Sequence, residues 1–183
     1  MLADGVKMSQ GALLSKNGAW PLYSSLSRGK GLLWSWVSFD STLTNDLHGR
    51  LSWRRPASPS PKYYTNGISA VRDLTGSRYV APIVAAERIL AMTNAVISFN
   101  GGNRGQLLEA NLILGLKAKV TNDSPHKLSL KFASSGLFSG TMREAGASKA
   151  FSFKGAVLQK ANMASGYFLG TNQSGRVRLR PAP

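Results

Sequence analysis

The chain has 183 residues and no cysteine, which excludes disulfides, thiolate metal sites and cysteine nucleophiles. Its 23 lysines and arginines against 8 acidic residues give a formal net charge of +15, and such a field attracts polyanions. Nineteen glycines and only 17% charged residues are typical of a turn-rich β protein rather than of a helical bundle, and no apolar run is long enough for a membrane helix.

Two early segments have the pattern of strands. Residues 20–23 read Trp-Pro-Leu-Tyr, and a proline is tolerated at the start or edge of a strand because it has no amide hydrogen to give. Residues 32–39 are apolar at most positions and short, which predicts a central strand that is buried on both faces.

Residues 47–55 alternate between apolar and polar side chains. Side chains of a strand point to opposite faces in turn, so Leu51 and Trp53 are predicted to face the core while Arg50 and Arg54 face solvent. The proline-rich residues 56–61 then predict an extended connection. We expect residues 62–82 to be an ordered loop anchored by tyrosines.

The second half of the chain contains further strand patterns. Residues 85–92 fit a helical turn, but the β-branched run that follows favours a strand from about Arg88 onward. The other predicted strands are residues 107–120, 128–132, 136–142 and 151–158. A final hairpin covers residues 166–181, in which Val177 and Leu179 point to the core and the alternating arginines point away.

These elements predict an all-β fold, mostly antiparallel, that forms a barrel or a barrel-like sandwich of about ten strands. We interpret residues 1–183 as one domain, with a first half at about 1–56, a connection at about 57–82 and a second half at about 83–183. Residues 49–54 resemble residues 175–180, which favours two related meander halves and hence an internal repeat.

Several glycine and aromatic motifs resemble a known kind of module. They are WPLY at 20–23, GKGLLWSW at 29–36, LSW at 51–53, FKGAVLQ at 153–159 and GYFLGTNQSG at 166–175. Together they are similar to an uncharacterised β module found near the C-termini of large multidomain exported proteins of environmental bacteria. The resemblance implies an extracellular or cell-surface setting and a fragment of a longer chain, and it supplies no catalytic residues. The first residues of the chain lack the features of a secretory signal.

Six arginines are the main candidate binding residues. If the two arginine-bearing strands are neighbours in a closed sheet, they form one basic face, which lysines at 127, 131 and 154 extend. The six are Arg50, Arg54, Arg55, Arg176, Arg178 and Arg180. Such a face suits an anionic polysaccharide or another cell-surface polymer, because counterion release drives polyanion binding without a precise motif. The alternative is a solvated face that protects the sheet from mispairing.

Aromatic residues provide a second candidate surface. Trp36 and Trp53 stand among apolar neighbours and are predicted to lie in the core. Tyr63 and Tyr64, in the loop after the prolines, are better candidates for an exposed platform. Aromatic faces of this kind stack on sugar rings where they are exposed.

Catalytic and metal-binding constellations are weak. His48 and His126 are far apart in the sequence, and most acidic residues fall in predicted turns, leaving Glu87 and Glu109 as the least explained carboxylates. We therefore expect no enzyme activity, no cofactor and no metal. The chain carries no recognised nucleic-acid-binding motif, so specific nucleic-acid binding is not expected. A barrel that binds a small apolar ligand is the alternative to a polymer-binding module, although the many large inward residues favour a filled interior.

Overall fold

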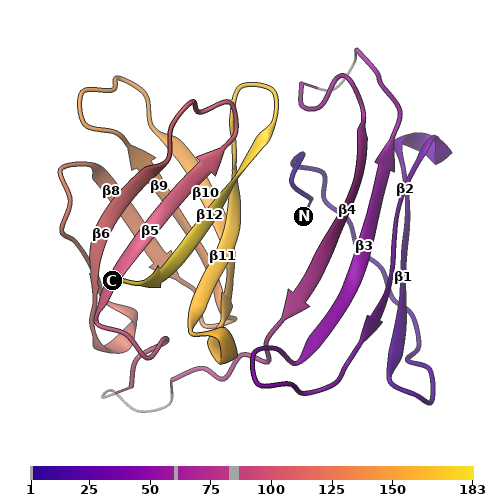
Figure 1. Ribbon diagram of the computed structural model, residues 1–183, viewed down its shortest axis with the longest axis horizontal. Helices are drawn as coiled ribbons and strands as arrows, with labels where there is room; N and C mark the ends of the chain where they lie inside the picture. The colour runs from indigo at the N-terminus through magenta and orange to yellow at the C-terminus, as the bar shows by residue number, and fades with distance from the viewer. Residues whose placement is uncertain (1, 60–61, 83–86) are drawn as a thin grey trace. The chain divides into compact units, whose positions relative to one another are not determined.

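The computed structural model describes residues 2–59, 62–82 and 87–183, and in this part of the chain the fold is all-β, as predicted. The described residues form twelve strands in two antiparallel sheets (Figure 1). The chain divides into two compact units, Met1–Ser77 and Arg78–Pro183. Each unit contains one of the sheets.

The first unit is a four-stranded meander in which each strand pairs with the next along the chain. Its strands are β1 (Ala19–Leu26), β2 (Gly31–Ser38), β3 (Leu47–Arg55) and β4 (Ile68–Gly76). A short 3-10 turn, η1 (Ser27–Gly29), connects the first two. The expected loop at 62–82 is thus wrong for β4, which pairs with β3 over its whole length and belongs to the first unit. The outer face of β4 is exposed to solvent and carries polar residues, so the sequence pattern did not predict a strand there. Residues 60 and 61 of the expected proline-rich connection lie outside the described residues.

One face of the first sheet is buried and the other is exposed. Leu33 and Val37 of β2 pack with Leu22 and Leu26 of β1 on the inner face. The prediction that residues 32–39 are buried on both faces is wrong, because burial alternates strictly along β2. The sequence of β2 is apolar, but its sheet is covered on one face only. Half of the β2 side chains therefore lie on the solvent side.

A buried ion pair ties the start of the chain to the end of β3. The Arg55 guanidinium donates from Nη1 to Asp4 Oδ2 at 2.9 Å, and the two side chains are only 6% and 3% exposed. Arg55 Nη2 also donates to the carbonyl oxygens of Tyr63 and Tyr64, at 2.6 and 2.9 Å. The Asp4 carboxylate in turn accepts the Val6 amide. This pair fastens three segments of the first unit together.

The second unit is an eight-stranded meander that curls into a nearly closed barrel. Its strands are β5 (Asn94–Gly101), β6 (Leu108–Leu114), β7 (Val120–Asn122), β8 (Lys127–Phe132), β9 (Leu137–Arg143), β10 (Phe151–Leu158), β11 (Met163–Leu169) and β12 (Ser174–Pro181). Short 3-10 turns, η2 (Leu116–Ala118) and η3 (Gln159–Ala161), follow β6 and β10. The last strand, β12, pairs with the first, β5, so that sequential order continues around the barrel.

The predicted strands of the second half match this barrel at most positions. The predicted ends of residues 151–158 agree with β10, and the final hairpin is β11 and β12. The segment at 107–120 is not one strand, since Gly115 and η2 turn the chain between β6 and β7. The strand expected from about Arg88 begins only at Asn94. Residues 85 and 86 of the alternative helical turn lie outside the described residues.

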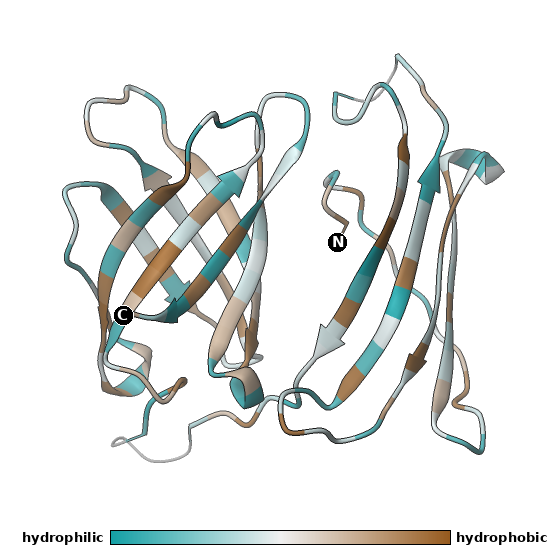
Figure 2. Ribbon diagram, viewed as in Figure 1, coloured by the Kyte–Doolittle hydropathy of each residue, from teal (hydrophilic) through white to brown (hydrophobic). Residues whose placement is uncertain are grey.

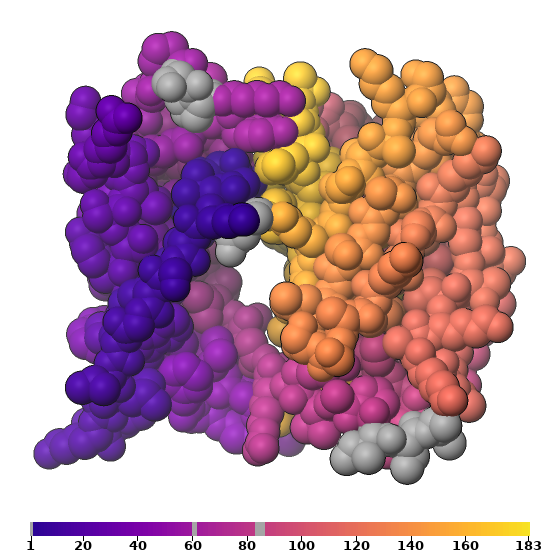
Figure 3. All heavy atoms as spheres, turned by 180° about the vertical axis from the view of Figure 1, so that it is seen from behind, coloured from indigo at the N-terminus to yellow at the C-terminus, as the bar shows by residue number. Residues whose placement is uncertain are grey.

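Phenylalanine rings fill the barrel. Hydrophobic and hydrophilic residues alternate along β12 (Figure 2), and its apolar residues Val177 and Leu179 point inward. The Phe99 ring centroid lies 5.0 Å from Phe153, 5.3 Å from Phe151 and 6.0 Å from Phe168. Figure 3 shows the heavy atoms of the chain as spheres, seen from behind. The core of the barrel is therefore packed with side chains.

Inward-facing glycines make room for these rings. A Cβ on Gly155 would lie 2.5 Å from Phe138 Cζ, and a Cβ on Gly175 would overlap the Phe168 ring. Because real side chains do not approach so closely, each glycine lets a ring from a neighbouring strand lie over the backbone. Gly155 of the FKG motif and Gly175 of the SGR motif are therefore needed for the packing of the core.

Primary amide side chains bind loose segments of the chain to strand ends. Gln159 of η3 accepts the Val80 amide at 2.7 Å and donates to the Val80 carbonyl at 2.9 Å. Asn162 pairs in the same way with both backbone groups of Ala91, at 2.8 and 3.2 Å. In the first unit, Gln10 accepts the Tyr23 amide and donates to the Pro21 carbonyl, so it covers part of the β1 edge.

Candidate functional site

The outer face of the barrel carries a row of polar side chains that crosses six strands. Antiparallel register fixes which outward residues lie side by side, and here successive pairs join into one line. The line, which we name the basic row, consists of Lys131, Ser139, Lys154, Tyr167, Arg176 and Asn100. All except the half-buried Tyr167 are exposed.

The cations of the basic row stand on alternate strands, with Lys131 on β8, Lys154 on β10 and Arg176 on β12. Neighbouring strands lie about 4.8 Å apart, so successive cations are separated by about 10 Å across the sheet. The Lys154 Nζ atom lies 5.7 Å from the centroid of the Tyr167 ring, which holds the lysine over the face of the ring. The row is therefore a regularly charged line rather than a cluster of repelling cations.

A groove of about 530 Å³ adjoins the β12 end of the row. Small side chains of β5 and β12 form its floor, and longer ones stand around it. The lining residues are Ser98, Asn100, Leu107, Glu109, Ser174, Gly175, Arg176, Arg178 and Arg180. In the register of the sheet, Arg178 lies beside Ser98, which lies beside Glu109 of β6.

Among the described residues, one arginine of the groove has an acidic partner. Arg180 Nη2 lies 3.2 Å from Glu109 Oε1, and both side chains are partly exposed. Arg176 and Arg178 have no acidic partner in the described ranges of the chain. Two guanidinium groups thus point into solvent beside the groove, where they are available to an anion.

The six arginines that the sequence grouped lie on strands of two different sheets. Arg50 and Arg54 point outward, as predicted, but their strand pairs with β2 and β4, whereas β12 pairs with β5 and β11. The two arginine strands are therefore not neighbours in one sheet. Arg55 is not a surface residue at all, because alternation places it on the inner side of β3, where it is buried with Asp4.

The expected tyrosine platform is only partly exposed. Tyr64 packs against Trp53, with ring centroids 6.1 Å apart, and Tyr63 lies beside the Lys62 ammonium at 5.3 Å. The backbone carbonyls of both tyrosines are held by Arg55. These two residues therefore help to build the first unit, and both rings are half-buried.

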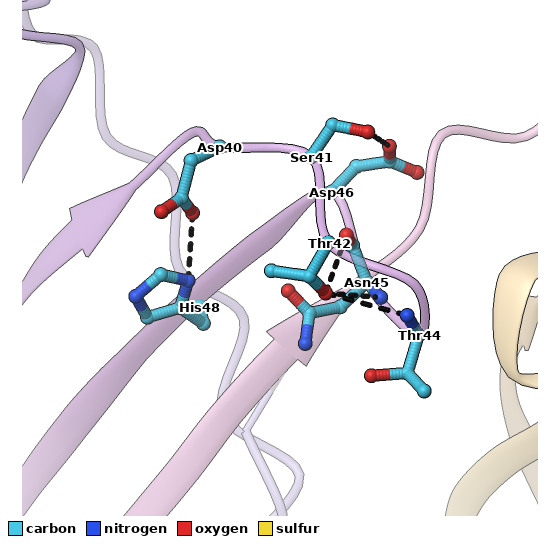
Figure 4. Close-up of polar contacts among 7 residues, drawn as sticks. All are labelled: Asp40, Ser41, Thr42, Thr44, Asn45, Asp46 and His48. Carbon is cyan, nitrogen blue, oxygen red and sulfur yellow. Dashed lines mark hydrogen bonds and ion pairs between the residues drawn. The ribbon is translucent and has the colours of Figure 1, made fainter.

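The histidines and most carboxylates take part in local contacts. Figure 4 shows the loop between β2 and β3, where His48 Nδ1 lies 2.8 Å from Asp40 Oδ1 and Ser41 donates to Asp46 at 3.3 Å. His126 Nδ1 accepts the Ala145 amide at 3.0 Å. In the described ranges no group of three or more His, Asp or Glu side chains is placed to hold a metal ion.

In the part of the chain that the structure describes, no helix has both the length and the apolar character needed to cross a membrane. Among the residues of the site that sequence reasoning missed are Ser98, Asn100, Ser139 and Tyr167, because their roles depend on strand register. Counting outward from each hairpin turn would have placed Tyr167 between Lys154 and Arg176, since β10, β11 and β12 are consecutive.

Comparison of the chain with models of protein families, with curated proteins and with solved structures gives no match.

Proposed function

We propose that this chain is a non-catalytic binding module that holds an anionic polysaccharide on the outer face of its barrel. The observation that supports this most directly is the basic row, with its three cations on alternate strands. A linear polyanion that crosses the strands meets a cation about every 10 Å. The groove beside Arg176 and Arg178 gives the chain a recessed place to lie.

The packed interior weighs against the alternative of a barrel that encloses a small apolar ligand. Phe99, Phe153 and Phe168 occupy the space in which such a ligand would lie. The outer face also favours a flexible polymer over a rigid duplex, because the cations follow a line across a curved sheet.

An extracellular or cell-surface location is part of the same proposal. It rests on the resemblance of the glycine and aromatic motifs to modules of exported bacterial proteins. Fractionation of a cell that produces the parent protein, with an antibody against this chain, tests it. Detection in the cytoplasmic fraction alone would contradict the location without affecting the binding proposal.

The test measures binding of the full chain to heparin, duplex DNA and neutral dextran across a salt series. Heparin is expected to bind, and the triple variant Lys154→Ser, Arg176→Ser and Arg178→Ser should weaken it at least tenfold. The slope of log affinity against log salt should fall by about 3, since each lost contact removes roughly one released counterion.

A charge-matched control separates the site from the net charge. Lys16→Ser, Lys117→Ser and Lys149→Ser remove three exposed cations from other places and should change heparin affinity little. An equal loss in both triple variants would contradict the proposed site. Tighter binding of duplex DNA than of heparin would contradict the polysaccharide.

A further inference from the structure

The outer face of the first unit exposes aromatic rings that its fold does not use. Tyr23 of β1 and Trp34 and Trp36 of β2 are 57%, 46% and 59% exposed. These residues point away from the apolar cluster of the inner face. Large exposed apolar surfaces on soluble proteins mark sites of interaction.

Strand register brings the three rings together with a proline. Tyr23 lies opposite Trp34, and Pro21 lies opposite Trp36 on the same face. Opposite residues are about 5 Å apart and successive outward residues of one strand about 7 Å apart. The four rings therefore form a two-by-two block, which we name the aromatic face: Pro21, Tyr23, Trp34 and Trp36.

The rings of the aromatic face are not engaged by the rest of the chain. Trp20 packs against Phe39, and Trp53 packs against Tyr64. Within the described residues, the side chains of Tyr23, Trp34 and Trp36 themselves make no ring contact and no hydrogen bond, although the backbones of Tyr23 and Trp36 are bonded by Gln10 and Ser35. Their ring faces and their polar hydrogens are thus available to a ligand.

The next strand supplies polar groups with little net charge. Ser52 of β3 lies opposite Trp34, and Arg50 lies opposite Asp73 of β4. At the end of the same strand, His48 contacts the Asp40 carboxylate. Hydroxyl, guanidinium and carboxylate groups lie next to the rings, and Arg54 is the main unbalanced charge of this face.

We infer that the aromatic face binds a neutral glycan chain. The C–H faces of pyranose rings are apolar and stack on aromatic rings, whose faces carry partial negative charge. The hydroxyl groups at the sugar edges meet the polar column that contains Arg50 and Ser52. This site is separate from the basic row in its residues and in its chemistry, and it holds whether or not the barrel binds a polyanion.

The near balance of charge distinguishes this ligand from the others that aromatic surfaces bind. Single-stranded nucleic acids need a positively charged track beside the stacking rings, and here Asp73 and Asp40 offset two of the basic groups. Tryptophan and tyrosine also anchor protein interfaces, where they fill pockets of the partner, so the experiment measures self-association beside glycan binding.

The experiment titrates the full chain with cellohexaose, xylohexaose and chitohexaose, each followed by calorimetry and by tryptophan fluorescence. Trp34 and Trp36 are two of the four tryptophans, so binding should shift the emission. Trp34→Ala and Trp36→Ala should each lower the affinity of the bound hexasaccharide by about tenfold or more, as loss of a stacking ring does elsewhere. Trp36→Phe keeps a ring face and should restore part of the affinity.

Leu43→Ala is the matched control, because Leu43 is an exposed apolar residue in the loop that follows β2. It should leave both the affinity and the circular dichroism unchanged. The inference is overturned if none of the three hexasaccharides binds, or if Trp34→Ala and Trp36→Ala bind as well as the parent chain. It is also overturned if these substitutions abolish binding of oligo-dT or self-association instead. Heparin binding through the basic row should persist in Trp36→Ala.

Discussion

The two units place their aromatic rings in opposite environments. In the barrel, Phe99 and its neighbours meet in the interior, whereas Trp34 and Trp36 of the first sheet point into solvent. Burial alternates strictly along β2, whereas in β5 three consecutive residues, 95–97, are buried and only the residues after them alternate. The barrel encloses a volume that large side chains must fill, but the first sheet has only one covered face. Aromatic content alone therefore does not mark a core, since burial depends on strand parity and on sheet closure.

The largest expected difference between the units concerns these rings. Phe99→Ala should lower the free energy of unfolding by about 3–5 kcal/mol, because it empties the centre of the barrel. Trp36→Ala should change it by less than about 0.5 kcal/mol, because the side chain is mostly in solvent. Urea titration followed by circular dichroism measures both. Equal losses would contradict the different placement of the two rings.

The buried ion pair sharpens the comparison within one strand. Arg55→Met should destabilise the first unit by about 3 kcal/mol, since it leaves Asp4 buried without its partner. Arg54→Met, at the adjacent outward position, should stay within about 0.5 kcal/mol. Hydrogen exchange of β3 amides measures the effect in the first unit. The double variant with Asp4→Asn should recover part of the loss, and no recovery would mean that the pair acts through packing alone.

The smallest expected change in stability concerns the glutamine side chains that bind backbone groups in both units. Gln159→Ala and Gln10→Ala should each lower the free energy of unfolding by about 1 kcal/mol, because backbone groups lose their partners. Thermal unfolding measures the loss, and Gln173→Ala, in the exposed turn before β12, is the control. A loss confined to Gln159 would show that the β1 edge is satisfied by water once Gln10 is removed.

The local sequence pattern predicted most strands correctly, but it did not predict which strands pair with one another. The alternation of β3 and β12 placed Arg50, Arg54 and Arg176 on the outside correctly, because parity depends only on the residues themselves. Whether two strands are neighbours depends on how the sheets are built, so the expectation that the two arginine strands pair in one closed sheet was wrong. Arg55 was misplaced because a charged residue at an inward position needs a partner, and Asp4 lies far away in the sequence. A shared origin of the two units remains a prediction.

The aromatic face was missed for a similar reason. The apolar run of β2 fits a strand covered on both sides as well as it fits a strand covered on one, and the sequence does not state how many layers the sheet has. The basic row depends on registers that span several hairpins. The consecutive strands β10, β11 and β12 were within reach of sequence reasoning, but the contribution of Asn100 required the pairing of β5 with β12.

The pairing of β12 with β5 also constrains the folding of the second unit during synthesis. Translation releases β5 first, and its edge toward β12 stays without a partner until the final strand emerges. The hairpins from β8 to β11 need only local contacts and can form earlier, whereas closure joins segments distant in sequence and is expected to be slow. In that interval the open edge of β5 is free to pair with another nascent chain. The strand that completes the basic row is therefore also the one that covers the open edge of β5.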